Sequence, residues 1–349
     1  MPIISRRTCA RFGAGLIAGV LLTACGASTA GITTSKKSST KQQPLVQAKF
    51  GSTATTQSLG GATAVYFAQQ LKKDSNGRIE VTVYPNSELG GTPTINAGLQ
   101  AGTIQFTAND ILDAYVPAID VLNTAYLFPS NPVAVSVLNS SAVYKLLWNK
   151  LPAEGLRVLA VWPSGFSDIF ATVPIDSPSA LRGIKIRTFV PAVETTEYSR
   201  VGANATAVVY DQVFTALSSH LIQAVTDPPD LVTPLQWETA APYVSIVNMA
   251  FVTTPLLVSQ SFWNSLDSIQ RAEVSKAAAA SLKYETAQAI TYNDNSITAL
   301  ESESGVHVLH PNVTPFGAAF RRAYPSIEAK FPGVLQELEK LVVAAKKAK

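Results

Sequence analysis

Cysteine and histidine are scarce in this chain of 349 residues, which has only two cysteines and three histidines. The cysteines are Cys9 and Cys25, so the chain beyond residue 44 holds no thiol and no disulfide. Nucleophilic cysteine chemistry and thiolate metal sites are therefore excluded from that part. His307 and His310 stand close together without an acidic cluster nearby. A metal pair there stays an alternative, but we predict no metal site.

The sequence also lacks the motifs of common enzymes. It contains no G-x-S-x-G elbow, no Walker A loop, no Rossmann glycine run and no H-E-x-x-H helix. Asp227 and Asp230 flank two prolines and offer an acid/base pair to a cryptic hydrolase, but a proline-stiffened loop explains them equally well. We therefore expect a protein that is not an enzyme and uses no cofactor.

The N-terminal residues have the pattern of an export signal. Three arginines precede an apolar run over residues 12–22, which is too short to span a membrane. The sequence LTACG at residues 22–26 resembles a bacterial lipobox, whose cysteine becomes lipidated and N-terminal. We predict a signal peptide over residues 1–24, by the general secretory or twin-arginine route. We expect a lipid anchor at Cys25 that places the protein in the cell envelope, in the periplasmic space or on the outer face of the cytoplasmic membrane.

Polar composition continues as far as residue 44 and predicts a flexible linker over residues 25–44, because the segment has too few apolar residues to form a core. Residues 1–44 hold six of the 27 Lys and Arg residues and none of the 24 Asp and Glu residues. The formal charge of +3 for the whole chain therefore becomes about −3 for the body. We expect no nucleic-acid partner, since no basic footprint remains.

The body alternates between helical and extended patterns. Helical spacing over residues 62–73, 94–101 and 136–150 is followed each time by an extended pattern, at residues 79–83, 104–107 and 156–161. This alternation predicts an α/β fold with largely parallel sheets, and the length favours two lobes. An uninterrupted helical pattern over residues 269–303 predicts a long spine helix, with a coiled-coil partner helix as the alternative.

A short predicted strand over residues 183–187 ends in Arg187. Ile184 and Ile186 alternate with Lys185, so Arg187 is expected on the face opposite the isoleucines. A guanidinium at a strand end can clamp both oxygens of a carboxylate. The alternative is a surface arginine in an ordinary ion pair. Aromatic residues at loop ends, which suit an enclosed organic anion or else a core, are Trp162, Phe166, Tyr210, Trp237 and Tyr243.

Residues 49–328 resemble the solute-binding proteins of tripartite ATP-independent periplasmic (TRAP) transporters, of the dicarboxylate-receptor (DctP) type. The blocks that carry the resemblance, in order, are SNGRIEVTVYPNSELGG (75–91), LQAGTI (99–104), YLF (126–128), EGLRVLA (154–160), LRGIKIR (181–187), VGA (201–203) and VFTAL (213–217).

The resemblance implies a two-lobed fold like that of periplasmic binding proteins, with crossing hinge strands and the long spine helix. We expect residues 45–164 plus 253–292 in one lobe and 165–252 plus 293–349 in the other. It implies that Arg187 forks onto a carboxylate, that Tyr210 packs on the ligand and that Asn109 lies near a polar contact. It further implies capture of a small organic acid and its delivery to TRAP permease subunits.

Several positions depart from the family pattern. The usual DGQENP loop is replaced by QAVTDP at residues 223–228, which puts Asp227 where an asparagine would donate to the carboxylate. Ser167 stands near the place of a second basic contact, and Gln212 replaces a common glutamate. These changes favour a monocarboxylate that also carries a polar or amino group. A ligand sensor for a membrane signalling protein stays the alternative function.

Overall fold

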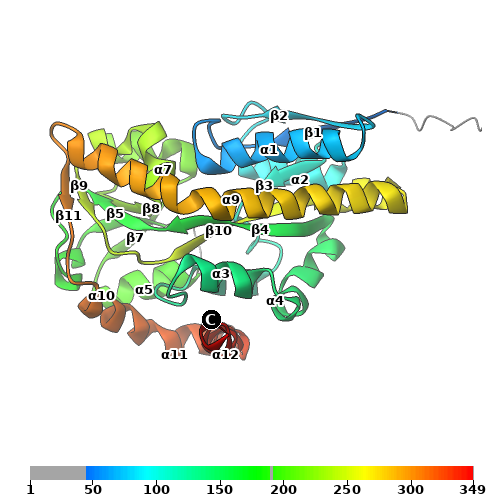
Figure 1. Ribbon diagram of the computed structural model, residues 1–349. Coiled ribbons are helices and arrows are strands. Elements are labelled where there is room, and N and C mark those ends of the chain that lie inside the picture. The colour runs from blue at the N-terminus through cyan, green and yellow to red at the C-terminus, as the bar shows by residue number, and fades with distance from the viewer. Residues whose placement is uncertain (1–44, 189–191, 349) are drawn as a thin grey trace, which may run out of the picture. The chain divides into compact units, whose positions relative to one another are not determined.

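The computed structural model describes residues 45–188 and 192–348. Two mixed β-sheets form its framework (Figure 1). The five-stranded sheet has the order β2-β1-β3-β10-β4 and the six-stranded sheet the order β11-β9-β5-β8-β6-β7. The strands are β1 Val46–Gly51, β2 Ile79–Tyr84, β3 Phe106–Ala108, β4 Leu156–Phe166, β5 Asp168–Ala171, β6 Lys185–Thr188, β7 Asn204–Ala207, β8 Ala224–Asp227, β9 Tyr243–Ser245, β10 Phe251–Ser259 and β11 His307–Leu309.

Helices cover both sheets and have their apolar faces in four buried clusters. The α-helices are α1 Leu59–Asp74, α2 Thr92–Ala101, α3 Asn131–Leu138, α4 Ser141–Leu146, α5 Ala192–Val201, α6 Val213–Ser218, α7 Pro229–Val232, α8 Gln260–Ser265, α9 Ser268–Ser302, α10 Val313–Phe320, α11 Tyr324–Lys330 and α12 Val334–Lys347. Short 3₁₀ helices connect them, among them η1 Pro117–Asn123, η2 Trp148–Glu154, η4 Tyr210–Gln212 and η6 Trp237–Thr239. The α/β class expected from the alternating pattern is confirmed.

Two short connections carry the chain between the sheets, and helices α8 and α9 make a third passage from β10 to β11. Strand β4 of the five-stranded sheet ends at Phe166, and β5 of the six-stranded sheet begins two residues later at Asp168. The return passes from β9 to β10. Strand β10 pairs antiparallel with β3 and β4, and β5 pairs antiparallel with β8 and β9. The expectation of largely parallel sheets is therefore wrong for these strands, because a strand that crosses and returns must run against its neighbours.

The long helix predicted from residue 269 onward is α9, which has 35 residues (Figure 1). A capping box starts it: Asp267 accepts a hydrogen bond from the backbone of Gln270, whose side chain accepts one from the backbone of Asp267. The helix packs against α1 and β4 in its first part and also contacts α7 and β11. It therefore runs along both sheets, as the predicted spine does.

The single helix expected over residues 136–150 is divided into α3, α4 and η2. Asn139 ends α3, and its side chain both donates to and accepts from the backbone of Val161 in β4. Ser140 then caps α4 by accepting from the backbone N–H of Val143. This expectation was wrong because Asn and Ser bond to backbone groups and so interrupt a helix that the apolar spacing alone would continue.

The two lobes cannot be separated cleanly by their helices. Helix α12 comes from the range expected in the second lobe, yet it packs against α3 and η1, which lie in the range expected in the first. The lobe boundaries stay a prediction. The predicted signal peptide, linker and lipidated Cys25 lie outside the described residues.

Candidate functional site

A cavity of about 170 Å³ lies where strands of both sheets end. Ser52 follows β1 and Asn109 follows β3, and Arg187 and Asp227 lie at the carboxyl ends of β6 and β8. Parallel strands carry ligand sites at their carboxyl ends, because the loops that follow them meet there. The cavity is therefore lined by the carboxyl ends of strands from both sheets, next to the crossing connections.

Arg187 is held in a buried position by strand β6. Ile186 is fully buried behind it and aligns with Ala224 of β8, while Lys185 at the other end of the strand is exposed. The Arg187 side chain is 9 % exposed, and its Nε donates to the carbonyl oxygen of Val208 over 3.1 Å. Such burial differs from that of an arginine in a surface ion pair. The strand end and the Val208 carbonyl together orient the guanidinium.

Tyr210 forms an aromatic wall beside this guanidinium. The Arg187 Cζ lies 5.7 Å from the centroid of the Tyr210 ring, within the range of a cation–π contact. Trp237 supports the ring from behind, edge-on at 5.1 Å between centroids. Burial raises the pKa of the Tyr210 hydroxyl well above its ordinary value, so this hydroxyl stays neutral. Tyr210 therefore offers the cavity an apolar face and a neutral polar group.

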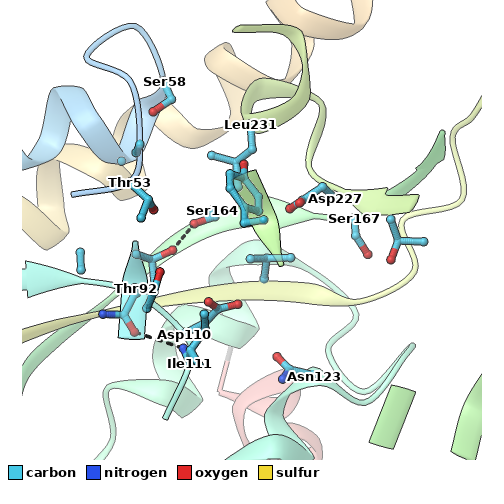
Figure 2. A pocket seen from close by; sticks show the side chains of 18 of the residues that line it. Thr53, Ser58, Thr92, Asp110, Ile111, Asn123, Ser164, Ser167, Asp227 and Leu231 are labelled. Atoms are coloured by element: carbon cyan, nitrogen blue, oxygen red, sulfur yellow. Dashed lines mark hydrogen bonds between the residues drawn. The ribbon is translucent and has the colours of Figure 1, made fainter. Parts of the chain in front are cut away.

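Asp227 is the last residue of β8 and lines the same cavity (Figure 2). Its side chain is 7 % exposed, and within the described residues its carboxyl group accepts no hydrogen bond and forms no ion pair. Burial, with smaller contributions from Asp110, Asp230 and Glu194, raises the pKa of Asp227 to about 8 although Arg187 opposes the rise. The carboxyl thus sits in a site that resists its ionisation.

Three further carboxyl groups line the cavity: those of Asp110, Asp113 and Glu194. Asp110 follows β3 and is exposed to the cavity, as Figure 2 shows. Desolvation by the surrounding protein raises its pKa to about 6, Glu194 and Asp113 add to the rise, and Arg187 opposes it. Glu194 accepts a hydrogen bond from the Thr188 hydroxyl over 2.8 Å. The site therefore concentrates carboxyl groups around Arg187.

The five-stranded sheet contributes mainly hydroxyl and amide groups. Asn109 donates to Asn96 over 2.9 Å and accepts from the backbone of Ile111 over 3.2 Å. Ser58 caps α1 by accepting from the backbone of Gly61 over 3.3 Å. A Cβ on Gly61 would lie 1.9 Å from the Thr55 carbonyl oxygen, so the loop after β1 packs directly on α1. These side chains shape the wall of the cavity, and most of their hydrogen bonds go to residues on the same side of the cavity.

Five of the predicted site residues line the cavity and three do not. Arg187, Tyr210, Asp227, Asn109 and Ser167 belong to its described lining, and Ser167 accepts a hydrogen bond from the backbone of Ala250. Trp162, Phe166 and Trp237 lie outside that lining.

Trp162 is fully buried in the core and donates from Nε1 to the Ser281 hydroxyl over 3.1 Å. Phe166 packs edge-on against Phe251 at 5.3 Å. A register shift between β4 and β10 at Val252 interrupts the alternation here. Ser164 instead reaches the cavity, bonded to Thr254.

Asp110, Asp113 and Glu194 are lining residues that the sequence patterns did not single out. Asp110 and Asp113 follow the strand predicted at residues 104–107, so polar residues after a strand were the available signal. Glu194 lies in the first turn of α5, far along the chain from both. Only the fold brings it beside them.

The alternatives to a binding site find little structural support. Asp230 does not belong to the described lining, although Asp227 does. His310 pairs with Glu301 over 3.1 Å on the surface, and His307 stacks on Tyr243. In the described part of the chain, no three His, Cys, Asp or Glu side chains are grouped to hold a metal ion. None of its helices is long and apolar enough to cross a membrane.

Comparison with known proteins places this architecture among binding proteins. The family model described as "Bacterial extracellular solute-binding protein, family 7" matches residues 50–330. The C4-dicarboxylate-binding periplasmic protein DctP of Rhodobacter capsulatus is 26% identical over 271 residues, which are 77% of this chain and 80% of that protein.

Two solved structures extend the similarity to three dimensions. A TRAP periplasmic solute-binding protein of Bordetella, with density interpreted as pantoate, is 26% identical with a TM-score of 0.80, covering 84% of this chain and 98% of its own. One from Xanthobacter autotrophicus with bound β-D-galacturonate is 25% identical with a TM-score of 0.78, covering 85% and 99%.

Proposed function

Because the chain belongs to the bacterial extracellular solute-binding proteins of family 7, we propose that it captures a small organic carboxylate and delivers it to the membrane subunits of a TRAP transporter. One similar structure has density interpreted as pantoate and the other has bound β-D-galacturonate, and the similar DctP is named for C4-dicarboxylates. All of these compounds carry a carboxylate. The shared feature of the ligands therefore matches the one guanidinium of the described cavity lining.

The observation that carries the proposal is the placement of Arg187. The residue is buried and oriented by Val208, and it lies beside the Tyr210 ring at the wall of a small cavity. A guanidinium in this position can donate two parallel hydrogen bonds to a carboxylate while the ring covers the apolar part of the ligand. The pairing strengthens as the lobes exclude water, because the local dielectric falls.

Thermal-shift screening of the purified protein tests the carboxylate requirement. Each small carboxylic acid is paired with its neutral amide, and a ligand that binds only the folded protein raises the melting temperature by mass action. We expect stabilisation by acids and not by their amides. Equal stabilisation by an acid and its amide would remove the carboxylate from the recognition.

Calorimetric titration of Arg187→Ala with the most stabilising acid tests the role of the residue. We expect at least a hundredfold loss of affinity, because the carboxylate would be buried without its partner. Lys185→Ala is the matched control, since it removes a positive charge from the exposed end of the same strand. Unchanged affinity in Arg187→Ala would exclude the assigned role.

We also propose that the ligand leaves the protein chemically unchanged. The family consists of binding proteins, and Asp230 does not line the cavity with Asp227. Mass spectrometry of a ligand incubated with the protein should recover only the starting mass. A product that forms with the native protein and not with Asp227→Asn would instead support a hydrolase.

Closure of the cavity is proposed to occur at the crossing connections. Residues 45–164 with 253–292 and residues 165–252 with 293–349 would approach each other about the β4–β5 and β9–β10 connections. Small-angle X-ray scattering should then give a smaller radius of gyration with saturating ligand than without it. An identical scattering curve in both states would argue against closure.

The anchor is the last part of the proposal. The LTACG sequence at residues 22–26 suits lipidation of Cys25, which would hold the receptor at a membrane surface near its transporter. Metabolic labelling with a radioactive fatty acid should mark the native protein and not Cys25→Ser. Release of the unlabelled variant into the soluble fraction should accompany the loss. Labelling of both proteins would place the lipid elsewhere, and labelling of neither would exclude it.

A further inference from the structure

The cavity holds more negative than positive groups. Its described lining includes one guanidinium, on Arg187, and no lysine or histidine. Four carboxyl groups share that lining, those of Asp110, Asp113, Glu194 and Asp227. A receptor for a plain anion gains little from such an excess, because each carboxylate repels the ligand that Arg187 attracts. The excess is therefore a feature of the site that capture of a carboxylate leaves unexplained.

Asp227 is the member of this set whose environment most requires a partner. It is more than nine-tenths buried, and no described residue donates a hydrogen bond to it. Figure 2 shows its carboxyl group among the side chains that line the pocket. Burial of a carboxylate without a partner is costly, so a donor on the ligand would remove an existing penalty.

Two other buried acids show how this fold satisfies a carboxyl group that has a structural role. Asp168 is 1 % exposed, and its Oδ1 accepts from the backbone N–H groups of Val247 and Asn248 over 2.7 and 2.9 Å. Glu197 is 2 % exposed and accepts from the backbone of Ala125 over 3.0 Å. Asp227 has no such donor in the described chain, although it lies opposite Asp168 in the β5–β8 pair.

Asp110 contributes a second carboxyl group to the same cavity, from the side opposite Asp227. It follows β3 of the five-stranded sheet, while Asp227 ends β8 of the six-stranded sheet. A negative charge on Asp110 raises the pKa of Asp227, so each group disfavours ionisation of the other. A positive group between them would pair with both and would also draw the two sheets together.

We propose that the natural ligand is a small zwitterion, whose carboxylate binds Arg187 and whose protonated nitrogen binds Asp227 with Asp110 beside it. The inference rests on the proposed function and specifies its ligand class. An ammonium or amidinium group both donates hydrogen bonds and neutralises the carboxylates, whereas a hydroxyl group does only the first. The cavity of about 170 Å³ limits the ligand to a compact molecule, well below the roughly 300–1,000 Å³ of pockets for drug-sized ligands.

Matched pairs of ligands test the inference by calorimetry on the full chain. Each pair shares a carbon skeleton and a carboxylate and differs in one group: alanine with lactate, valine with 2-hydroxy-3-methylbutanoate, and 4-aminobutanoate with 4-hydroxybutanoate. Succinate is added as a dicarboxylate. We expect the amino member of at least one pair to bind at least tenfold more tightly than its hydroxy partner, and succinate to bind more weakly than both.

The variant Asp227→Asn then tests whether Asp227 causes the preference for amino over hydroxy ligands. The variant should lose at least tenfold in affinity for the amino member and less than threefold for the hydroxy member, because the amide keeps the size and a polar group but not the charge. Asp211→Asn is the matched control, since Asp211 is exposed beside Tyr210 and does not belong to the described lining. It should leave both affinities unchanged.

The possible failures are distinguishable. Tight binding of hydroxy acids or succinate, with the amino acids excluded, would overturn the zwitterion and leave the carboxylate receptor in place. An amino preference that survives in Asp227→Asn would overturn the assignment to Asp227. Failure of every acid in both this panel and the amide-paired screen, amino or not, would overturn the receptor itself and the inference with it.

Discussion

The two sides of the cavity use their polar groups differently. On the side of the five-stranded sheet, Ser58 and Asn109 bond to groups on the same side of the cavity. On the side of the six-stranded sheet, Arg187 and Asp227 bring a guanidinium and a carboxyl group to the carboxyl ends of β6 and β8. Asp110 and Asp113 are the exceptions, two acidic residues that the first side contributes.

This difference suggests a division of labour. Groups already bonded within the protein give a wall of fixed shape, and buried charges held by strands give strong and directional contacts. The six-stranded side would therefore determine which ligand binds. The five-stranded side would complete its enclosure.

The largest expected effect is a loss of stability from a substitution in the core behind Arg187. Ile186→Ala removes a fully buried side chain from the middle of β6 and should lower the free energy of unfolding by about 2–5 kcal/mol. Urea unfolding measures it, with exposed Lys185→Ala as the control, expected within about 0.5 kcal/mol of the native protein. A loss below about 1 kcal/mol would mean that β6 is not held by its core.

The next largest effect is expected on ligand affinity, where a substitution of Arg187 is compared with one on the opposite wall of the cavity. Arg187→Lys keeps the charge but loses the planar fork, and we expect a tenfold to hundredfold loss of affinity, about 1.4–2.7 kcal/mol. Thr53→Val on the opposite wall should cost less than threefold. Calorimetry with the acid that stabilises the protein most measures both variants, and equal losses would contradict the division of labour.

We expect Asp227 to make the free energy of unfolding depend on pH, which the hydroxyl and amide groups of the opposite wall cannot do. Its pKa of about 8 in the fold exceeds the ordinary value of 3.8, because burial, Asp110, Asp230 and Glu194 outweigh Arg187. Between these pH values the folded protein keeps a proton that the unfolded chain has lost, so this group lowers stability as pH rises. Asp227→Asn does not titrate there.

We therefore expect unliganded Asp227→Asn to be more stable than the native protein at pH 9, by at least about 1 kcal/mol. The difference should shrink towards pH 3, where Asp227 is protonated in the fold and largely so in the unfolded chain. Urea unfolding at both pH values measures it. A difference that stays constant with pH would show that the proton on Asp227 is not linked to folding.

The smallest effect is expected on the five-stranded side. Ser58→Ala removes the N-cap of α1 and should cost about 1 kcal/mol of stability, whereas Ser58→Gly should cost only a few tenths of a kcal/mol. Ligand affinity should change less than threefold in both variants. A tenfold loss of affinity would make Ser58 a ligand contact rather than part of the wall.

Residues with strong local patterns were predicted well from the sequence. The spine helix α9 and strand β2 follow from uninterrupted helical spacing and from strict alternation. The strand that carries Arg187 was also expected, although it begins at Lys185 rather than Gly183. In each case the local pattern and the tertiary packing favour the same structure.

The remaining features depend on contacts between distant residues. Asn139 bonds to Val161 and interrupts the helix expected there, and the register shift in β4 turns Ser164 rather than Trp162 towards the cavity. Glu194 joins Asp110 only through the fold. No spacing along the chain encodes these contacts, so the negative charge of the cavity could not be predicted from local patterns.

A crystal structure of the protein with its tightest-binding ligand would test the central claim most directly. The account predicts that the ligand lies between the two sheets, with its carboxylate on the Arg187 guanidinium, its apolar part against the Tyr210 ring and a protonated nitrogen at hydrogen-bonding distance from Asp227. A ligand whose carboxylate contacts other residues and leaves Arg187 in its present bonds would contradict it.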